Sequence, residues 1–217
     1  MTTTSISRTL VARRTGAAAC LMVALLPGCS FFGKVEPLAP RYYDPEIEAS
    51  EGKSLAPSLA RPQLRLGHVL GGSHLRERIA YRVGEREVGF YDELRWTERP
   101  ENYLRRALAR TLFEERGISS LVTGVGPSLD VELVDFSELL KPRHAVRVRA
   151  RAVLVDQRTV RFEHTFTAEE DVRGDSDDFS HVADAMARAL ERTVAEIGDR
   201  VLAELTSPDT SGAATPK

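Results

Sequence analysis

The sequence is poor in cysteine, in tryptophan and in long apolar runs. Its 217 residues include two cysteines, Cys20 and Cys29, and one tryptophan, Trp96. The apolar run at residues 16–26 (GAAACLMVALL) is 11 residues long, whereas a helix that spans a bilayer needs about 20. This run is therefore too short to be a stable transmembrane anchor.

Catalytic and metal-binding motifs are missing as well. GxSxG is absent, and GVGPS at residues 124–128 lacks the lysine and the spacing of a phosphate-binding loop. No two histidines have the spacing of a metal site on a helix; they are His68, His74, His144, His164 and His181. We expect no metal, no cofactor apart from a covalent lipid, and no enzymatic activity; a hydrolase is the least favoured class.

The chain also lacks an excess of basic residues. Its formal net charge is −2, and the first 28 residues contain three arginines and no acid. Without them, 27 basic residues stand against 32 acidic ones, a net charge of −5. Nucleic acid is excluded as the main partner, because phosphate binding depends on clustered lysine and arginine.

The N-terminal segment has the layout of a secretory signal. Residues 1–28 combine a basic start, the apolar run and small residues at its end. Leu26-Pro27-Gly28-Cys29 resembles the bacterial lipobox, although Pro27 departs from it. We expect cleavage before Cys29 and a diacylglycerol on its thiol, with acyl chains such as palmitate anchoring the protein. The alternatives are ordinary secretion with a free thiol, or a retained tail.

The position after Cys29 bears on the membrane that holds the anchor. In bacteria, an aspartate there tends to retain a lipoprotein at the inner membrane, and Ser30 stands here instead. We therefore expect a lipid anchor in the outer membrane of a Gram-negative bacterium, with the protein facing the periplasm. Cleavage would leave no second cysteine, so no disulfide could form within a subunit.

The rest of the chain divides into a tether, one domain and a tail. Residues 29–62 are rich in proline and predict a tether, to which Tyr42-Tyr43 could add a first strand. The domain spans 63–206, and 207–217 form a disordered tail. Alternation predicts six strands, at 64–70, 78–83, 87–95, 129–134, 145–155 and 159–167. Helical periodicity predicts one helix from Pro100 to about Gly117 and another at about 178–205.

These elements predict an α/β fold: a mixed sheet of about five or six strands with an antiparallel meander, packed by two long helices. In the strand 145–155, Val146, Val148 and Ala150 share one face, and the other face carries Arg147, Arg149 and Arg151. That arginine row could bind phosphate head groups or an acidic partner. Alternatively, it pairs across strands with Asp130, Glu132 and Glu163.

Trp96 lies between the third strand and the first helix, in LRWTERPENYLRRAL. It is expected to pack at that corner, with a contact role as the alternative.

The ordered set of segments resembles a known family, the auxiliary lipoproteins of ABC-type transport systems (the PqiC/YmbA-like group). The resemblance runs from about Tyr42 to Leu205. It is carried by the lipobox Cys29, Tyr42-Tyr43 and a series of segments: LRLGHVL, RERIAYRVGEREVGFYDELRWTERPENYLRRAL, HAVRVRARAVLVD, FEHTFTAEE and ADAMARALERTVAEI. The segment with the tryptophan is the most specific part.

The resemblance implies a topology similar to anticodon-binding-like domains and a non-catalytic role beside an MCE-domain protein and an ABC transporter that moves lipids between two membranes. Self-association is implied too, since some members form rings. Only Cys29 carries over as a site. The first hypothesis is a scaffold of an ABC/MCE-type lipid transport system that supports membrane integrity. The second is a periplasmic module that itself binds a lipid or another hydrophobic ligand.

Overall fold

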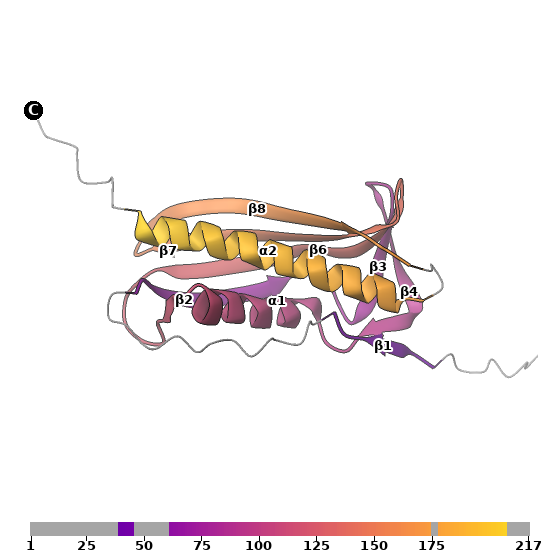
Figure 1. The fold of residues 1–217 in the computed structure, drawn as a ribbon, viewed down its shortest axis with the longest axis horizontal. Coiled ribbons are helices and arrows are strands. Elements are labelled where there is room, and N and C mark those ends of the chain that lie inside the picture. The colour runs from indigo at the N-terminus through magenta and orange to yellow at the C-terminus, as the bar shows by residue number, and fades with distance from the viewer. Residues whose placement is uncertain (1–38, 46–60, 175–177, 208–217) are drawn as a thin grey trace, which may run out of the picture. The chain divides into compact units, whose positions relative to one another are not determined.

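The computed structural model describes residues 39–45, 61–174 and 178–207, which all belong to one compact unit, Leu38–Lys217. The predicted signal, Cys29, most of the predicted tether and nearly all of the tail lie outside the described residues. The helices and strands, drawn in Figure 1, are β1 (Arg41–Tyr43), β2 (Gln63–Gly71), β3 (Arg78–Val83), β4 (Glu87–Trp96), α1 (Pro100–Ala109), the π-helical η1 (Arg110–Glu115), β5 (Ser119–Ser120), β6 (Ser128–Lys141), β7 (Ala145–Asp156), β8 (Thr159–Asp171) and α2 (Ser180–Thr206).

The strands form one mixed sheet of eight strands organised around β6. One edge of β6 pairs with β7, which in turn pairs with β8, in antiparallel ladders. The other edge of β6 pairs in parallel with β2 along its first half and with β3 along its second half. β4 pairs antiparallel with β3, β1 is parallel to β4, and β5 is parallel to the start of β2. Most paired residues therefore lie in antiparallel ladders.

The predicted fold class is confirmed, and the number of strands is higher than the predicted five or six. The additional strands are β1, with three residues, and β5, with two. Neither is long enough to show an alternating pattern. Strand β6 continues to Lys141, beyond the predicted end at residue 134, because a register shift between Leu133 and Asp135 interrupts its alternation.

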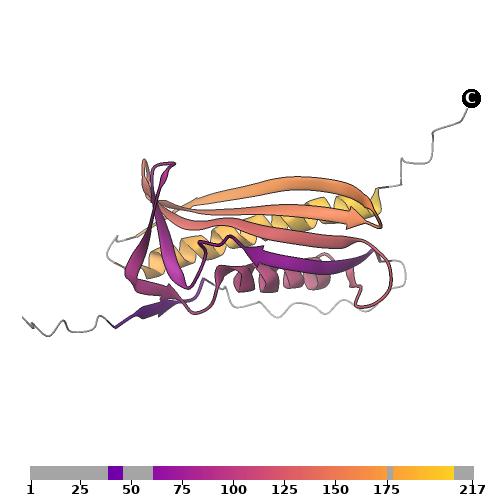
Figure 2. The same ribbon diagram turned by 180° about the vertical axis from the view of Figure 1, so that it is seen from behind.

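Both helices cover the same face of the sheet, as Figures 1 and 2 show from opposite sides. Helix α2 packs against β7 and β8, and α1 packs against β2 and β6. Pro100 opens α1, which suits a residue without a backbone N–H. The π-helical turn η1 extends the helix, and Gly117, with φ of 67°, turns the chain into β5.

The core lies between the helices and the sheet. On β7, Val146, Val148 and Ala150 are completely buried, and on α2 Met186 and Val194 are at most 1% exposed. Because side chains alternate along a strand, the arginines of β7 must lie on the opposite face of the sheet. The helices leave that face uncovered, and we term it the outer face.

Candidate interaction surface

The outer face carries the arginine row of β7, and its members differ in their surroundings. Arg147 is only 9% exposed. Its Nε donates to Oε1 of Glu169 on β8 at 2.8 Å, and its Nη2 donates to Oε1 of Glu85, in the β3–β4 turn, at 3.4 Å. Arg147 thus connects the hairpin tip to the sheet.

Arg151, at the other end of the row, is more open to solvent. Its Nη2 donates to Oε1 of Glu163 at 2.6 Å, and its Nη1 lies 3.8 Å from Oε2 of Glu132. Two of the three predicted acidic partners are therefore in place. The third, Asp130, instead accepts a hydrogen bond from the backbone N–H of His68 at 2.7 Å.

Arg149, between them, is the exception in the row. Its strand neighbours are Asp135 on β6 and Thr167 on β8. Within residues 39–45, 61–174 and 178–207, neither a hydrogen bond nor an ion pair engages its guanidinium. The side chain is half-buried. Among the described residues, Arg149 is thus a half-buried cation on the outer face without a side-chain partner.

A buried carboxylate explains why Arg149 has no acidic partner on β6. Asp135 is 2% exposed, and its Oδ2 lies 2.9 Å from Nε of Arg82 on β3. Its Oδ1 accepts a hydrogen bond from the hydroxyl of Ser137 at 2.7 Å. Both carboxylate oxygens are therefore already engaged. The sequence did not reveal this pair, because the register shift in β6 hides which face Asp135 occupies.

The charges of this face act on one another. Burial opposes ionisation of Glu169, but hydrogen bonds and charges from Arg147 and Arg143 outweigh it and hold the pKa of this carboxyl below its ordinary value of 4.5. Arg143, in the β6–β7 turn, also pairs with Asp171. Arg147 and Arg151 thus belong to a ladder of ion pairs across the strands. For these two arginines the structure shows cross-strand pairing, the alternative to binding a phosphate head group or an acidic partner.

Trp96, the other predicted contact residue, lies in the interior. It is 1% exposed and meets the ring of Phe136 edge-on, with 5.4 Å between the ring centroids. Phe179, at the start of α2, lies 6.2 Å away and also contacts Tyr43 and Tyr91. In this conformation the indole packs the strand–helix corner and is not accessible to a partner.

A second buried carboxylate lies on the helix side, at the far end of β6. Glu138 is 3% exposed. The Tyr91 hydroxyl donates to its Oε2 at 2.6 Å, and Nε2 of His144 lies 2.5 Å from its Oε1. Burial, with the hydrogen bond to Glu138, raises the pKa of Tyr91 well above its ordinary value. This cluster joins β4, β6 and the β6–β7 turn, and it fixes the end of the sheet where α2 begins.

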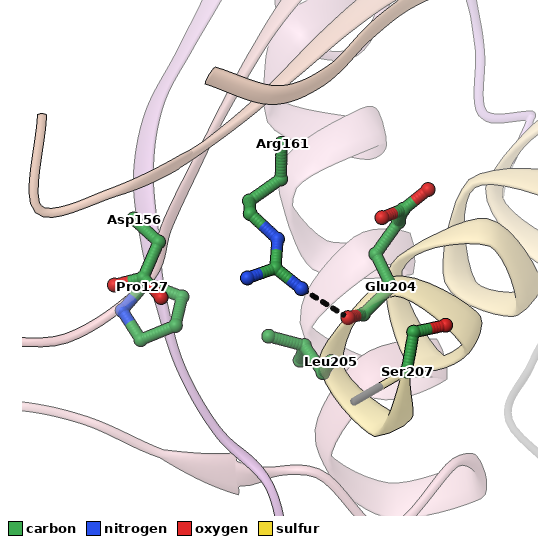
Figure 3. Close-up of a pocket in the computed structure, with 6 residues that line it drawn as sticks. All are labelled: Pro127, Asp156, Arg161, Glu204, Leu205 and Ser207. Carbon is green, nitrogen blue, oxygen red and sulfur yellow. Dashed lines mark hydrogen bonds between the residues drawn. The ribbon is translucent and has the colours of Figure 1, made fainter. Parts of the chain in front are cut away.

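A small pocket lies at the opposite end of the domain, beside the end of α2 (Figure 3). Its volume is about 140 Å³, and it is lined by Pro127, Asp156, Arg161, Glu204, Leu205 and Ser207. Nη2 of Arg161 donates to the backbone oxygen of Glu204 at 3.2 Å, where a cation balances the helix dipole. The pocket is small and largely polar. We therefore interpret Arg161 as a residue that stabilises the C-terminal end of α2.

Two further properties of the described residues restrict the class of protein. They contain no group of three or more histidine, cysteine, aspartate or glutamate side chains arranged to hold a metal ion. None of the helices formed by these residues is both long and apolar enough to cross a membrane. The fold and the outer face define a mixed α/β domain built around a packed core and a charged, structured surface.

The family follows from comparison with known proteins. The family model described as "ABC-type transport auxiliary lipoprotein component" matches residues 47–200, so the chain belongs to this family of transport-auxiliary lipoproteins. The predicted family is thereby confirmed. No curated protein shows significant similarity to the chain.

Solved structures support the fold. The crystal structure of XCC0632 from Xanthomonas campestris is similar with a TM-score of 0.64 and 18% identity, over 76% of this chain and 95% of that one. The CT253 protein of Chlamydia trachomatis is similar with a TM-score of 0.51 and 11% identity, over 69% of this chain and all of that one. At these identities the likeness shows a shared fold alone.

Proposed function

We propose that the protein is a lipid-anchored, non-catalytic scaffold of an ABC/MCE-type system that transports lipids between two membranes. The family match over residues 47–200 carries the transport-auxiliary part of this proposal. The anchor is Cys29, which ends a lipobox-like sequence behind a short apolar run. The acyl chains would hold the protein in the outer membrane, with the domain in the periplasm beside an MCE-domain protein. A self-associated form, such as a ring, is compatible with this role.

The packing favours a scaffold over the alternative of a lipid-binding module. A lipid carrier needs an apolar cavity between the helices and the sheet, with a volume of several hundred Å³. Here large side chains fill that layer: Tyr103, Leu104, Leu108, Leu133, Phe136 and Ile197 are all completely buried. A lipid could enter only by displacing side chains that are packed to interior density.

Arg149 is the residue that we propose as a contact for the transport partner. It is half-buried on the outer face, and its neighbours Arg147 and Arg151 already bind carboxylates. A carboxylate of the partner would gain a charge-assisted hydrogen bond there. Arg149→Glu should reduce recovery of the MCE-domain protein in affinity purification. The matched control is Arg188→Glu on the exposed side of α2. Equal recovery with both variants would contradict the contact.

The anchor is tested by metabolic labelling with palmitate. The wild-type protein and Cys20→Ala should incorporate label and sediment with outer membranes, while Cys29→Ala should do neither. Cys20→Ala is the matched control, because it removes the other cysteine of the chain. An unlabelled wild-type protein would contradict the anchor, and label that persists in Cys29→Ala would assign it to another residue.

The lipid-binding alternative is tested by mass spectrometry. The protein extracted in mild detergent should carry the covalent lipid of Cys29 and no stoichiometric free lipid after exchange into lipid-free detergent. A tightly retained free lipid at one molecule per chain would favour the binding module over the scaffold.

A further inference from the structure

Strand β8 is the long open edge of the sheet. It has 13 residues and pairs with β7 from end to end, and no other strand of the described chain pairs with it. The other outermost strands, β1 and β5, have three and two residues. They pair only with Leu94–Trp96 of β4 and Gln63–Leu64 of β2, so β4 and β2 also have open edges in the described chain, both shorter than the 13 residues of β8. Figure 1 shows β8 along the upper border of the sheet, where α2 covers its face and leaves its edge open. A long edge presents unpaired N–H and C=O groups, a template for another strand.

The residues of β8 do not protect this edge. Proteins commonly guard exposed edges with charged residues, especially lysine, or with proline. β8 contains neither lysine nor proline, and its charged residues lie towards its two ends. Its central segment, residues 164–168 (HTFTA), carries no acid or formal cation. The flanking acids are held by their own domain: Glu163 pairs with Arg151, Glu169 with Arg147 and Glu170 with Arg192. The backbone of this edge is thus unpaired in the described chain, and its central segment carries no charge that would repel a second strand.

We propose that this edge binds the β8 edge of a second copy of the chain, antiparallel, about a two-fold axis at Thr165. This register places Glu163 opposite Thr167 of the second copy, and His164 opposite Phe166 of the second copy. Thr165 faces its own counterpart. Directly opposed side chains of paired strands share a face, so Phe166, already edge-on to His164 in its own chain at 4.7 Å, gains a second aromatic neighbour.

The charges of β8 disfavour two other arrangements. Parallel pairing in register would set each acid opposite itself, and an axis at Phe166 would set Glu163 opposite Glu169 of the second copy. The axis at Thr165 avoids both, because like charges directly opposite destabilise a sheet. It also brings the basic start of the hairpin strand, with Arg158 and Arg161, alongside the acidic end at residues 169–171 of the second copy. The pairing requires neither the lipid anchor nor the transport partner, so it goes beyond the proposed function.

The axis position is tested by cross-linking the full-length chain in membranes. Thr165→Cys and Thr167→Cys both place a thiol on the same exposed face of β8. In the proposed dimer the two Thr165 positions lie about 5 Å apart. The two Thr167 positions are four residues apart along the strands, about 13 Å at about 3.3 Å per residue.

A bismaleimide too short for the longer span should cross-link Thr165→Cys and not Thr167→Cys, with the wild-type chain as background for Cys20 and Cys29. Equal cross-linking of both variants, or none with Thr165→Cys, would overturn the proposal.

Lysine substitutions test the same register in solution. Thr165→Lys sets two lysines against each other at the axis, and Thr167→Lys sets a lysine opposite Glu163 of the second copy. Within one chain each lysine lies beside an arginine of β7, Arg151 or Arg149. Arg151 is paired with Glu163, so the repulsion within the chain is weaker for Thr165→Lys than for Thr167→Lys and cannot account for a dimer that only Thr165→Lys weakens. Sedimentation equilibrium of the full chain in mild detergent should show a dimer.

Thr165→Lys should weaken that dimer about fivefold, while Thr167→Lys should leave it unchanged or tighten it. A monomer at all concentrations, or the same weakening by both variants, would overturn the proposal.

Discussion

The two faces of strand β7 have the same spacing and opposite chemistry. On the helix side, Val146, Val148 and Ala150 are completely buried beneath α2. On the outer side, Arg147 and Arg151 are held in ionic pairs with β8, and Arg149 between them has no ion pair within the described residues. The contrast separates two kinds of interaction within one strand: the helix side buries apolar side chains in the core, and the outer side holds a charged surface together by ion pairs.

The largest loss of stability is expected from a substitution of Trp96 in the core on the helix side of the sheet. This indole is 1% exposed and packs on Phe136 and Phe179. Trp96→Ala should lower the free energy of unfolding by about 3–5 kcal/mol, because it leaves a cavity in the core. Tyr42→Ala, at an aromatic side chain that is 62% exposed, should change it little. Chemical denaturation measures both, and a near-neutral Trp96→Ala would contradict the packing role.

The next largest effect is expected on the outer side, where one charge is buried. Asp135→Ala should cost about 3 kcal/mol, since it leaves Arg82 without its carboxylate in a largely buried position. Asp130→Ala is the control, as it removes a half-exposed aspartate of the same strand together with its hydrogen bond from the backbone of His68. Denaturation should separate the two clearly. Equal stabilities of the two variants would contradict a structural role for the pair of Asp135 and Arg82.

A smaller effect should distinguish the two paired arginines of the row. Arg147→Ala removes a largely buried guanidinium with two acidic partners and should cost about 1 kcal/mol. Arg151→Ala removes an exposed guanidinium and should change stability little. Thermal melts at low and high salt provide the comparison. Greater destabilisation by Arg151→Ala than by Arg147→Ala would reverse the assignment of which pair is structural.

The smallest effect concerns pH. The arginines around Glu169 lower its pKa in the folded state, so its contribution to stability is present above the ordinary pKa of 4.5 and is lost as pH falls through the lower folded value. The wild-type protein should therefore lose stability more steeply below about pH 5 than Glu169→Gln. Glu196→Gln, on the exposed side of α2, should keep the wild-type slope. Denaturant titrations at several pH values test this, and parallel slopes for all three proteins would contradict it.

Much of the fold could be predicted from the sequence, because alternation and helical periodicity report directly on burial. Strand β3 has the predicted bounds, residues 78–83, and α2 differs from its prediction by two residues or fewer at each end. The short strands β1 and β5 carry too few residues for a periodic signal. The second half of β6 was missed because its register shift places Asp135 and Phe136 on faces that simple alternation does not assign.

The chemistry of the surface was less predictable than the fold. The parity of Arg151 and Glu163 is visible in the sequence, and their pairing follows from neighbouring strands. Arg147 pairs with Glu169 and with the turn residue Glu85. These two pairings depend on strand length and on the twist of the hairpin. The cluster of Tyr91, Glu138 and His144 joins three separate elements, and no local pattern in the sequence indicates it.

The proposed function is best tested by affinity purification of the full-length protein from membranes in mild detergent, followed by identification of the proteins that come with it. The transport-auxiliary role predicts that an MCE-domain protein and components of an ABC transporter co-purify with the wild-type chain. Recovery should fall for Arg149→Glu and stay unchanged for Arg188→Glu. Recovery of the wild-type chain without any MCE-domain or ABC-transporter protein would contradict the proposed function.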